Sequence, residues 1–254
     1  MTKTFRSLLL GAGVALAALS SPVLAQGTPP RAEIEAIIKD YLIKNPEVIQ
    51  EALIELDRRQ RDAETQARAR VLKDDGGLIY KSKHNAVVGN PNGDVTIVEF
   101  FDYNCGYCKR GLADLQRLVK EDPKVRVILK DFPILSPQSR DAAAVAVVVK
   151  GLVKPEVYWD FHGKLMAKTG GIGKPQAIEV ATSLGVDAAR IEKELLRPDI
   201  AEAFAETRKI ADSLGLTGTP SYILADDVVV GAVGYDQLKE RVENVRKCGK
   251  NVCG

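Results

Sequence analysis

Two cysteines three residues apart, Cys105 and Cys108, carry the clearest chemistry in the sequence. The β-branched and aromatic run 95–101 before them predicts a buried strand, and leucines at helical spacing after them predict a helix that begins at the cysteines. The free N–H groups and dipole of a helix N-terminus favour negative charge, so we expect Cys105 to form a thiolate readily. A thiolate is the nucleophile of disulfide exchange, and Cys108 can attack the mixed disulfide that Cys105 forms.

A pair of this spacing is also half of a zinc site, and a structural zinc ion needs four ligands. The other candidates are Cys248 and Cys253, far along the chain, and the scattered histidines His84 and His162. Because these do not complete a zinc-binding pattern, disulfide exchange is the favoured interpretation. It predicts no metal site and no cofactor beyond the redox-active cysteine pair. We expect His84 to lie at the surface and residues 158–166, which include His162, to form helical core.

Glu99 is a carboxylate in an otherwise apolar strand. Alternation places it on the same face as Ile97 and Phe101, which points inward. An isolated buried carboxylate has a raised pKa, and this would suit a proton shuttle for Cys108. The alternative is a glutamate at a solvated strand end.

Three segments together resemble one known family. Glu-Phe-Phe-Asp-Tyr-Asn-Cys-Gly-Tyr-Cys-Lys (99–109) resembles the active-site signature of DsbA-like thioredoxin-fold proteins. Lys-Asp-Phe-Pro-Ile-Leu (130–135) and Thr-Gly-Thr-Pro-Ser-Tyr (217–222) resemble two further landmarks of that family, and the likeness runs from about residue 77 to residue 245. The resemblance implies an α/β fold, in which a thioredoxin fold carries an inserted all-helical domain.

The resemblance also implies roles for residues around the cysteines. Pro220 would be the cis-proline of the family, leaving the backbone of Thr219 free to pair with an extended substrate beside Cys105. The hydroxyl of Thr219 would tune the sulfurs, and Glu99 matches the buried acid of the family. Gly106 and Tyr107, between the two cysteines, are expected to contact the substrate.

Protein disulfide oxidases, reductases and isomerases share this fold and differ in reduction potential. DsbA-type oxidases have Pro-His between their cysteines, whereas Gly106-Tyr107 followed by Thr219 before the proline is similar to DsbC-type isomerases. This implies an isomerase or reductase that acts on misfolded or oxidised exported proteins and is kept reduced by a membrane reductase of the ScsB or DsbD type. The alternatives are a DsbA-like oxidase recharged by a DsbB-like protein, and a copper-binding thiol chaperone, for which the sequence has no Met-rich or His-rich tract.

Before the globular part, residues 31–56 carry an apolar stripe, and residues 57–70 are almost wholly polar helix formers. Tyr-Leu-x-x-Asn-Pro-Glu-Val-Ile-x-Glu-Ala-Leu (41–53) resembles the amino-terminal oligomerisation segment of the ScsC (suppressor of copper sensitivity) branch of the family. The stripe must pack either on the globular domain or on copies of itself, and the polar spacer favours copies, so we expect a homo-oligomer. The resemblance implies a trimer with a link to copper tolerance.

Residues 1–25 have a basic start, a short apolar run and small residues at 23–25, which predicts a cleaved signal peptide and export to the periplasm. Disulfides persist there, so Cys248 and Cys253 are expected to form a structural bond, although a second redox relay or soft-metal capture would also use such a pair. With 36 basic and 34 acidic residues interspersed, the chain has no basic patch for nucleic acid.

The pattern of apolar runs and turn residues, together with the family resemblance, which implies the thioredoxin parts and the inserted helical domain, divides the chain into five parts. They are the signal peptide 1–25, the helical arm and charged spacer 26–75, the first thioredoxin part 76–135, the inserted helical domain 136–215, and the second thioredoxin part 216–254. Short strands are expected at 78–80 and 86–88, and a hairpin at 221–224 and 228–233. Asp236 is expected to cap the last helix.

Overall fold

The computed structural model describes residues 30–253, so the predicted signal peptide 1–25 lies outside the described residues. The chain divides into two compact units at Leu56 and Asp57, and each is described by itself. The sequence predicted this boundary at residues 75 and 76. In the described residues no helix is both long and apolar enough to cross a membrane.

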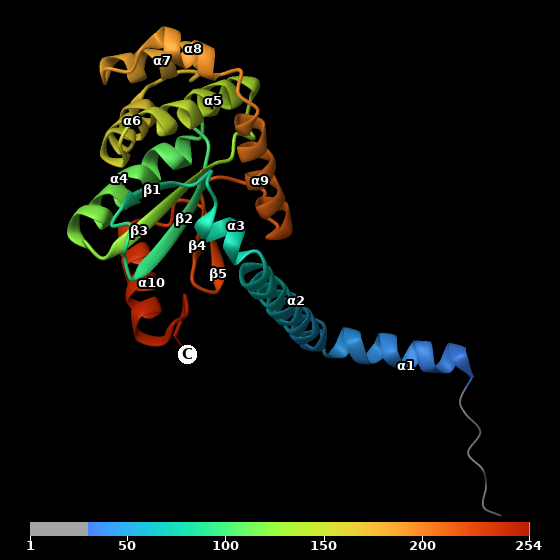
Figure 1. Cartoon of the computed structure of the whole chain (residues 1–254). Coiled ribbons are helices and arrows are strands. Elements are labelled where there is room, and N and C mark those ends of the chain that lie inside the picture. The colour runs from blue at the N-terminus through green and yellow to red at the C-terminus, as the bar shows by residue number, and fades with distance from the viewer. Residues whose placement is uncertain (1–29, 254) are drawn as a thin grey trace, which may run out of the picture. The chain divides into compact units, whose positions relative to one another are not determined.

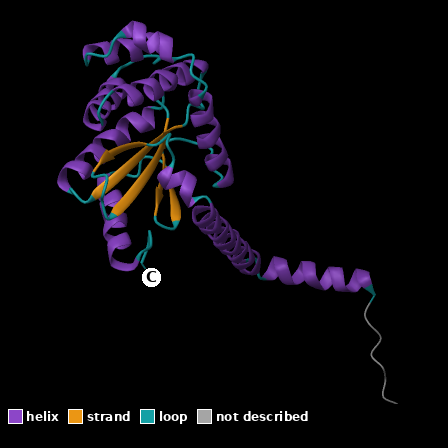
Figure 2. Ribbon diagram, viewed as in Figure 1, coloured by secondary structure: helices purple, strands orange, loops and turns teal. Residues whose placement is uncertain are grey.

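A five-stranded mixed sheet forms the centre of the second unit (Figure 2). Its order is β1-β3-β2-β4-β5, in which β2 and β3 are parallel and the other pairs are antiparallel. The strands are β1 (Ala86–Gly89), β2 (Val95–Phe101), β3 (Val125–Asp131), β4 (Ser221–Leu224) and β5 (Asp227–Val230). The parallel β2–β3 pair is joined through a helix, which is the usual connection between parallel neighbours in a sheet.

Alternating side chains of β2 divide the core into two layers. Ile97 and Phe101 pack with α4 (Gly106–Glu121) and α10 (Tyr235–Cys248), whereas Val98 and Phe100 pack with α3 (Gly76–Lys81) and α9 (Asp199–Ser213). Figure 1 shows α4 and α9 on opposite sides of the strands. Because successive side chains point to opposite faces of a sheet, Glu99 lies on the α4 side.

The segment between β3 and β4 is entirely helical, as predicted. It contains α5 (Pro137–Leu152), α6 (Pro155–Ala167), α7 (Lys174–Ser183), α8 (Ala188–Glu194) and α9. The hydroxyl of Ser136 caps α5 by accepting from the N–H of Ser139, and Pro137 occupies the first turn. The valines of α5 are buried within the same core that underlies the sheet.

Three local predictions are corrected. Residues 78–80 are not a strand: they lie in α3, where Ile79 is buried against the sheet and α9. A three-residue apolar run cannot distinguish a strand from one helical turn, so tertiary burial decides. β5 spans Asp227–Val230 rather than 228–233, and α10 begins after Gly234, whose φ is 90°, with Asp236 inside the first turn.

The first unit contains α1 (Arg31–Lys44) and the beginning of α2 (Glu47–Asp74). None of the residues of α1 is buried. The stripe that the sequence predicted is exposed in the single chain, and its large side chains are Ile34, Ile37, Ile38, Tyr41, Ile49, Leu53 and Leu56. The end of α2 belongs to the second unit, because Leu72 is buried beside Ile79 in the α9-side core.

Candidate active site

The two cysteines lie where β2 is followed by α4. Cys105 is the residue immediately before the helix, and Cys108 lies in its first turn. Both are free thiols. Cys105 is 6% exposed and Cys108 is 0% exposed, so only Cys105 can be reached from solvent.

The sulfur of Cys105 contacts the segment before β4. Its thiol donates a hydrogen bond to the carbonyl oxygen of Thr219, with 3.1 Å between the two atoms. The peptide bond between Thr219 and Pro220 is cis, as the resemblance implied. The structure therefore places the Thr219 backbone directly beside the accessible sulfur.

The dipeptide between the cysteines is open to solvent. A side-chain carbon added at Gly106 would meet no atom within 4 Å, and Tyr107 is 61% exposed. The guanidinium of Arg110 stacks over the Tyr107 ring at 4.2 Å from its centre. The dipeptide between Cys105 and Cys108 is therefore exposed to solvent.

Asp102 and Asn104, in the loop before α4, connect the start of the cysteine helix to neighbouring segments through hydrogen bonds. The sequence did not predict a role for either residue. One carboxylate oxygen of Asp102 accepts from the N–H of Asn104, and the other accepts from the N–H groups of Ile134 and Leu135. The side-chain amide of Asn104 exchanges two hydrogen bonds with the backbone of Ile172 in the helical domain. The only local signal was an Asp-x-Asn pair after a strand, which is common in turns.

Glu99 is buried, as alternation predicted, with 1% of its surface exposed. Burial raises the pKa of Glu99 to about 8, and the hydroxyl of Tyr222 partly offsets this rise. One carboxylate oxygen has no hydrogen-bond partner of ordinary geometry among the described residues. A carboxyl group with this pKa exchanges its proton near neutral pH, as a general acid or base must.

Cys108 is held as a neutral thiol. Burial raises its pKa far above the usual range, and the charge of Glu99 raises it further. The backbone of Asp102 and the hydroxyl of Thr219 lower it in part. Cys108 must therefore lose a proton before it can attack a disulfide, and Glu99 is the carboxyl that faces it.

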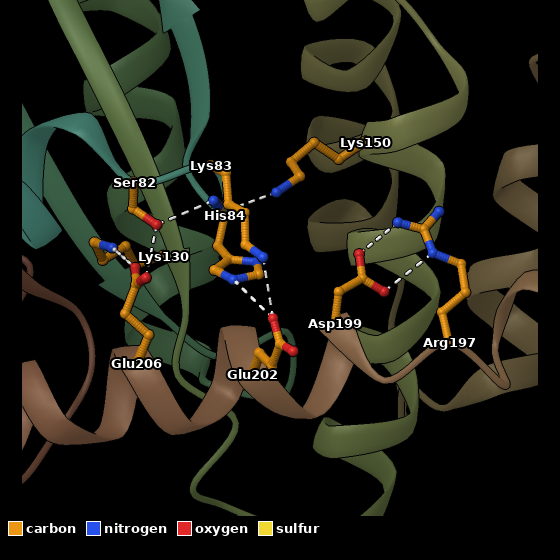
Figure 3. Close-up of polar contacts among 9 residues, drawn as sticks. All are labelled: Ser82, Lys83, His84, Lys130, Lys150, Arg197, Asp199, Glu202 and Glu206. Atoms are coloured by element: carbon orange, nitrogen blue, oxygen red, sulfur yellow. Dashed lines mark hydrogen bonds and ion pairs between the residues drawn. The ribbon is translucent and has the colours of Figure 1, made fainter.

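His84 is half-buried, whereas the sequence predicted a position at the surface. Its ring is 10% exposed and lies 3.8 Å from a carboxylate oxygen of Glu202. Its carbonyl oxygen accepts from the ammonium of Lys150 at 2.6 Å, and Lys83 also pairs with Glu202 (Figure 3). Packing of the 82–85 segment on α9 and α5 buries the ring, which sequence neighbours could not reveal. Burial lowers the pKa of His84.

His162 and its neighbours are core, as predicted. The His162 ring stacks on Trp159, and Nδ1 lies 3.2 Å from the hydroxyl of Tyr103, in the loop before Cys105. Burial lowers the pKa of His162 to about 3, so the ring is neutral. Among residues 30–253, no group of three or more histidine, cysteine, aspartate or glutamate side chains could hold a metal ion.

Cys248 and Cys253 form a disulfide at the end of α10. The residues between them are anchored, because Asn251 is buried and bonds to Arg241 and Asp226. The pair is therefore an anchored part of the fold and not a loose tail.

A thioredoxin-type sheet, an accessible thiol before a helix, a buried second thiol one turn later and a cis-proline beside them define a thiol–disulfide oxidoreductase. Residues 96–243 match the DSBA-like thioredoxin domain, and the chain belongs to this family. Residues 31–63 match the copper resistance protein ScsC N-terminal domain.

Known relatives agree with this assignment. A thioredoxin-like oxidoreductase from Silicibacter pomeroyi DSS-3 is 35% identical, with a TM-score of 0.64 over 68% of this chain and 98% of that one. ScsC of Proteus mirabilis, in a transitional conformation, is 29% identical, with a TM-score of 0.63 over 84% of this chain and 93% of that one. Disulfide bond formation protein D of Bacillus subtilis (strain 168) is 26% identical over 174 residues, which are 65% of this chain and 78% of that protein.

Proposed function

We propose that this protein is a periplasmic disulfide isomerase or reductase in which Cys105 attacks substrate disulfides and Cys108 resolves the mixed disulfide. The main support for this proposal is the difference in exposure between the two sulfurs: that of Cys105 is accessible, and that of Cys108 is fully buried beside Glu99. The cysteine pair itself carries the electrons, without a further cofactor. The disulfide at Cys248 and Cys253 suits an oxidising compartment.

In the proposed reaction, the Cys105 thiolate attacks one sulfur of a substrate disulfide and releases the other as a thiolate. The substrate chain pairs with the backbone of Thr219 as an added strand, next to Tyr107. Glu99 takes the proton of Cys108, whose thiolate then attacks Cys105 and frees the reduced substrate. When a second thiolate of the substrate attacks the mixed disulfide instead, a new disulfide forms within the substrate, the bond to Cys105 breaks and Cys105 leaves as a thiolate, which is isomerisation.

Isomerisation requires reduced Cys105, so we infer that a membrane thiol reductase of the ScsB or DsbD type is the partner that keeps it reduced. Misfolded or oxidised exported proteins are the substrates. The exposed stripe of α1 and α2, together with the match to the ScsC N-terminal domain, supports assembly into a homotrimer.

A dithiol oxidase is the second candidate, and the named activity of the Bacillus subtilis relative favours it. Trapping thiols in cells with an alkylating reagent that adds mass distinguishes an oxidase from an isomerase or reductase. An isomerase or reductase is expected to have Cys105 and Cys108 mostly reduced at steady state. A mostly oxidised pair would overturn the proposal and favour the oxidase.

The name of the matched N-terminal family favours a third candidate, a copper-binding thiol chaperone. Tight stoichiometric Cu(I) binding by the reduced protein, without turnover on scrambled ribonuclease, would favour that candidate over the isomerase.

A further inference from the structure

Tyr222 is a fully buried tyrosine directly across the sheet from Glu99. The two residues are paired in the antiparallel register of β2 and β4, so their side chains lie on the same face. Tyr222 is 0% exposed, and its hydroxyl has no hydrogen bond of ordinary geometry among the described residues. A buried hydroxyl without a partner costs free energy, so its position calls for an explanation.

The hydroxyl reaches the helix that carries the cysteines. A side-chain carbon added at Gly111 would lie 2.8 Å from the Tyr222 oxygen, which is closer than such atoms approach. Gly111 is on α4, three residues after Cys108 and therefore on the same side of the helix. The absence of a side chain at Gly111 thus leaves the space that the phenol oxygen occupies.

The titratable groups that act on this hydroxyl come from β2 and α4. Glu99 faces it from β2 and Cys108 from α4, and the charge of either group raises the pKa of Tyr222, after burial as the main cause. Asp114, also on α4, acts in the same direction more weakly. Tyr103, in the loop before α4, is close enough to be affected by the charge of Glu99. On β3 the residue paired with Glu99 is the apolar Leu129.

We propose that Tyr222 is a positioning residue for the disulfide chemistry, whose hydroxyl donates to the Glu99 carboxylate and holds it ready to take the proton of Cys108. This rests on the proposed function of Glu99. When Cys108 attacks, its proton moves to Glu99 and its sulfur forms a bond to Cys105, while the bond from Cys105 to the substrate sulfur breaks. The electron pair of the broken bond leaves with the substrate thiolate.

The test measures the reactions of Cys105 and Cys108 as two successive kinetic steps. Reduced full-length protein reacts with dithiobis(nitrobenzoate), and stopped-flow absorbance follows two releases of the coloured thiolate. The first release reports attack by Cys105, and the second reports attack by Cys108 on the mixed disulfide. Loss of the hydroxyl raises the pKa of Glu99, so Tyr222→Phe should slow the second release about tenfold near pH 7. It should also move the inflection of the pH profile upward and leave the first release unchanged.

Tyr158→Phe is the matched control, because Tyr158 is a similarly buried tyrosine whose hydroxyl likewise makes no hydrogen bond of ordinary geometry within residues 30–253. It should leave both releases unchanged. Glu99→Gln should slow the second release, and adding Tyr222→Phe to it should have no further effect, because both act on one proton transfer. If Glu99→Gln has no effect, the role of Glu99 is overturned and the role of Tyr222 with it. If Glu99→Gln slows the second release while Tyr222→Phe leaves its rate and pH profile unchanged, only the role of Tyr222 is overturned.

Gly111→Ala tests the geometry independently of turnover. The new methyl group would collide with the Tyr222 oxygen, so this variant should lose stability and show the slow second release. In the Tyr222→Phe background the oxygen is absent, and the same substitution should cost clearly less stability. An equal loss of stability in both backgrounds would contradict the placement of the hydroxyl against Gly111.

Discussion

At the scale of single residues, the two thiols differ in reactivity because that of Cys105 is accessible and that of Cys108 is buried. Cys105 donates to the Thr219 carbonyl at the surface of the site, whereas Cys108 lies beneath it with a strongly raised pKa. A buried thiol is a poor nucleophile until its proton is removed, and in the proposed mechanism the nearby carboxyl of Glu99 takes that proton.

Glu99 also makes the stability of the protein depend on pH. Its pKa rises from an ordinary 4.5 to about 8 on folding, so between these values the folded state binds more protons than the unfolded state. Stability therefore falls as pH rises through this range, by up to about 5 kcal/mol from this group. Glu99→Gln is expected to match the wild type near pH 5 and to be more stable by several kcal/mol near pH 8, as measured by urea unfolding of the reduced protein.

The exposed Glu243 offers the control, since Glu243→Gln should change stability by less than about 0.5 kcal/mol across the same range. A difference between Glu99→Gln and wild type that does not vary with pH would contradict the buried, proton-exchanging carboxyl.

At the scale of elements, a buried ion pair ties the segment after α2 to the sheet and to α9. The ammonium of Lys130 on β3 donates to Glu206 on α9 at 3.0 Å and to the carbonyl of Leu78. The hydroxyl of Ser82 donates to the other carboxylate oxygen of Glu206 (Figure 3). Lys130 is part of the Lys-Asp-Phe-Pro-Ile-Leu segment, so this motif connects elements as well as marking the family.

Removing one partner of this pair should leave a buried charge. Glu206→Ala is expected to lower the free energy of unfolding by about 3 kcal/mol and to speed hydrogen exchange in residues 76–85. Glu202→Ala, at a half-exposed carboxylate on the same helix, should cost less than about 1 kcal/mol. The double variant Lys130→Met with Glu206→Leu should recover most of the loss, and failure to recover it would contradict the ion pair as the cause.

At the scale of the whole molecule, the large apolar side chains of the stripe at residues 34–56 stay exposed in the single chain. Burying each large side chain of that stripe contributes about 1.5–3 kcal/mol, which is enough to drive self-association. An assembly would place several Cys105 sites around one substrate, so that its disulfides could be tried repeatedly.

Removing the stripe should separate assembly from chemistry. A chain of residues 57–254 keeps Leu72 in the core and is expected to fold, to be monomeric by light scattering, and to reduce insulin at the wild-type rate. It should lose most of its activity on scrambled ribonuclease. A full-length protein that is monomeric at micromolar concentration would contradict assembly through the stripe, and a dimer would contradict the trimer alone.

Much of the site follows from local patterns in the sequence. The placement of Cys105 and Cys108 between a strand and a helix needs only the change of periodicity at residue 105, and the inward direction of Glu99 needs only alternation along one strand. The run Ala142–Val149 in α5 has no such local signal, because valines suit a buried strand as well as a buried helix, and its helical state follows from the inserted helical domain that the resemblance implies.

The chemistry of the cysteine pair, the inward direction of Glu99 and an arm with an unpartnered apolar stripe therefore follow from the sequence alone. The direct contact between the Thr219 carbonyl and the Cys105 sulfur, across 114 residues of chain, and the position of the Tyr222 hydroxyl against Gly111 follow from how the chain packs. The helical state of residues 78–80 and the half-buried position of His84 follow from the same packing. The physical reason is the same in each case: these positions depend on which strands and helices pack together, and local periodicity carries no information about contacts between segments distant in the chain.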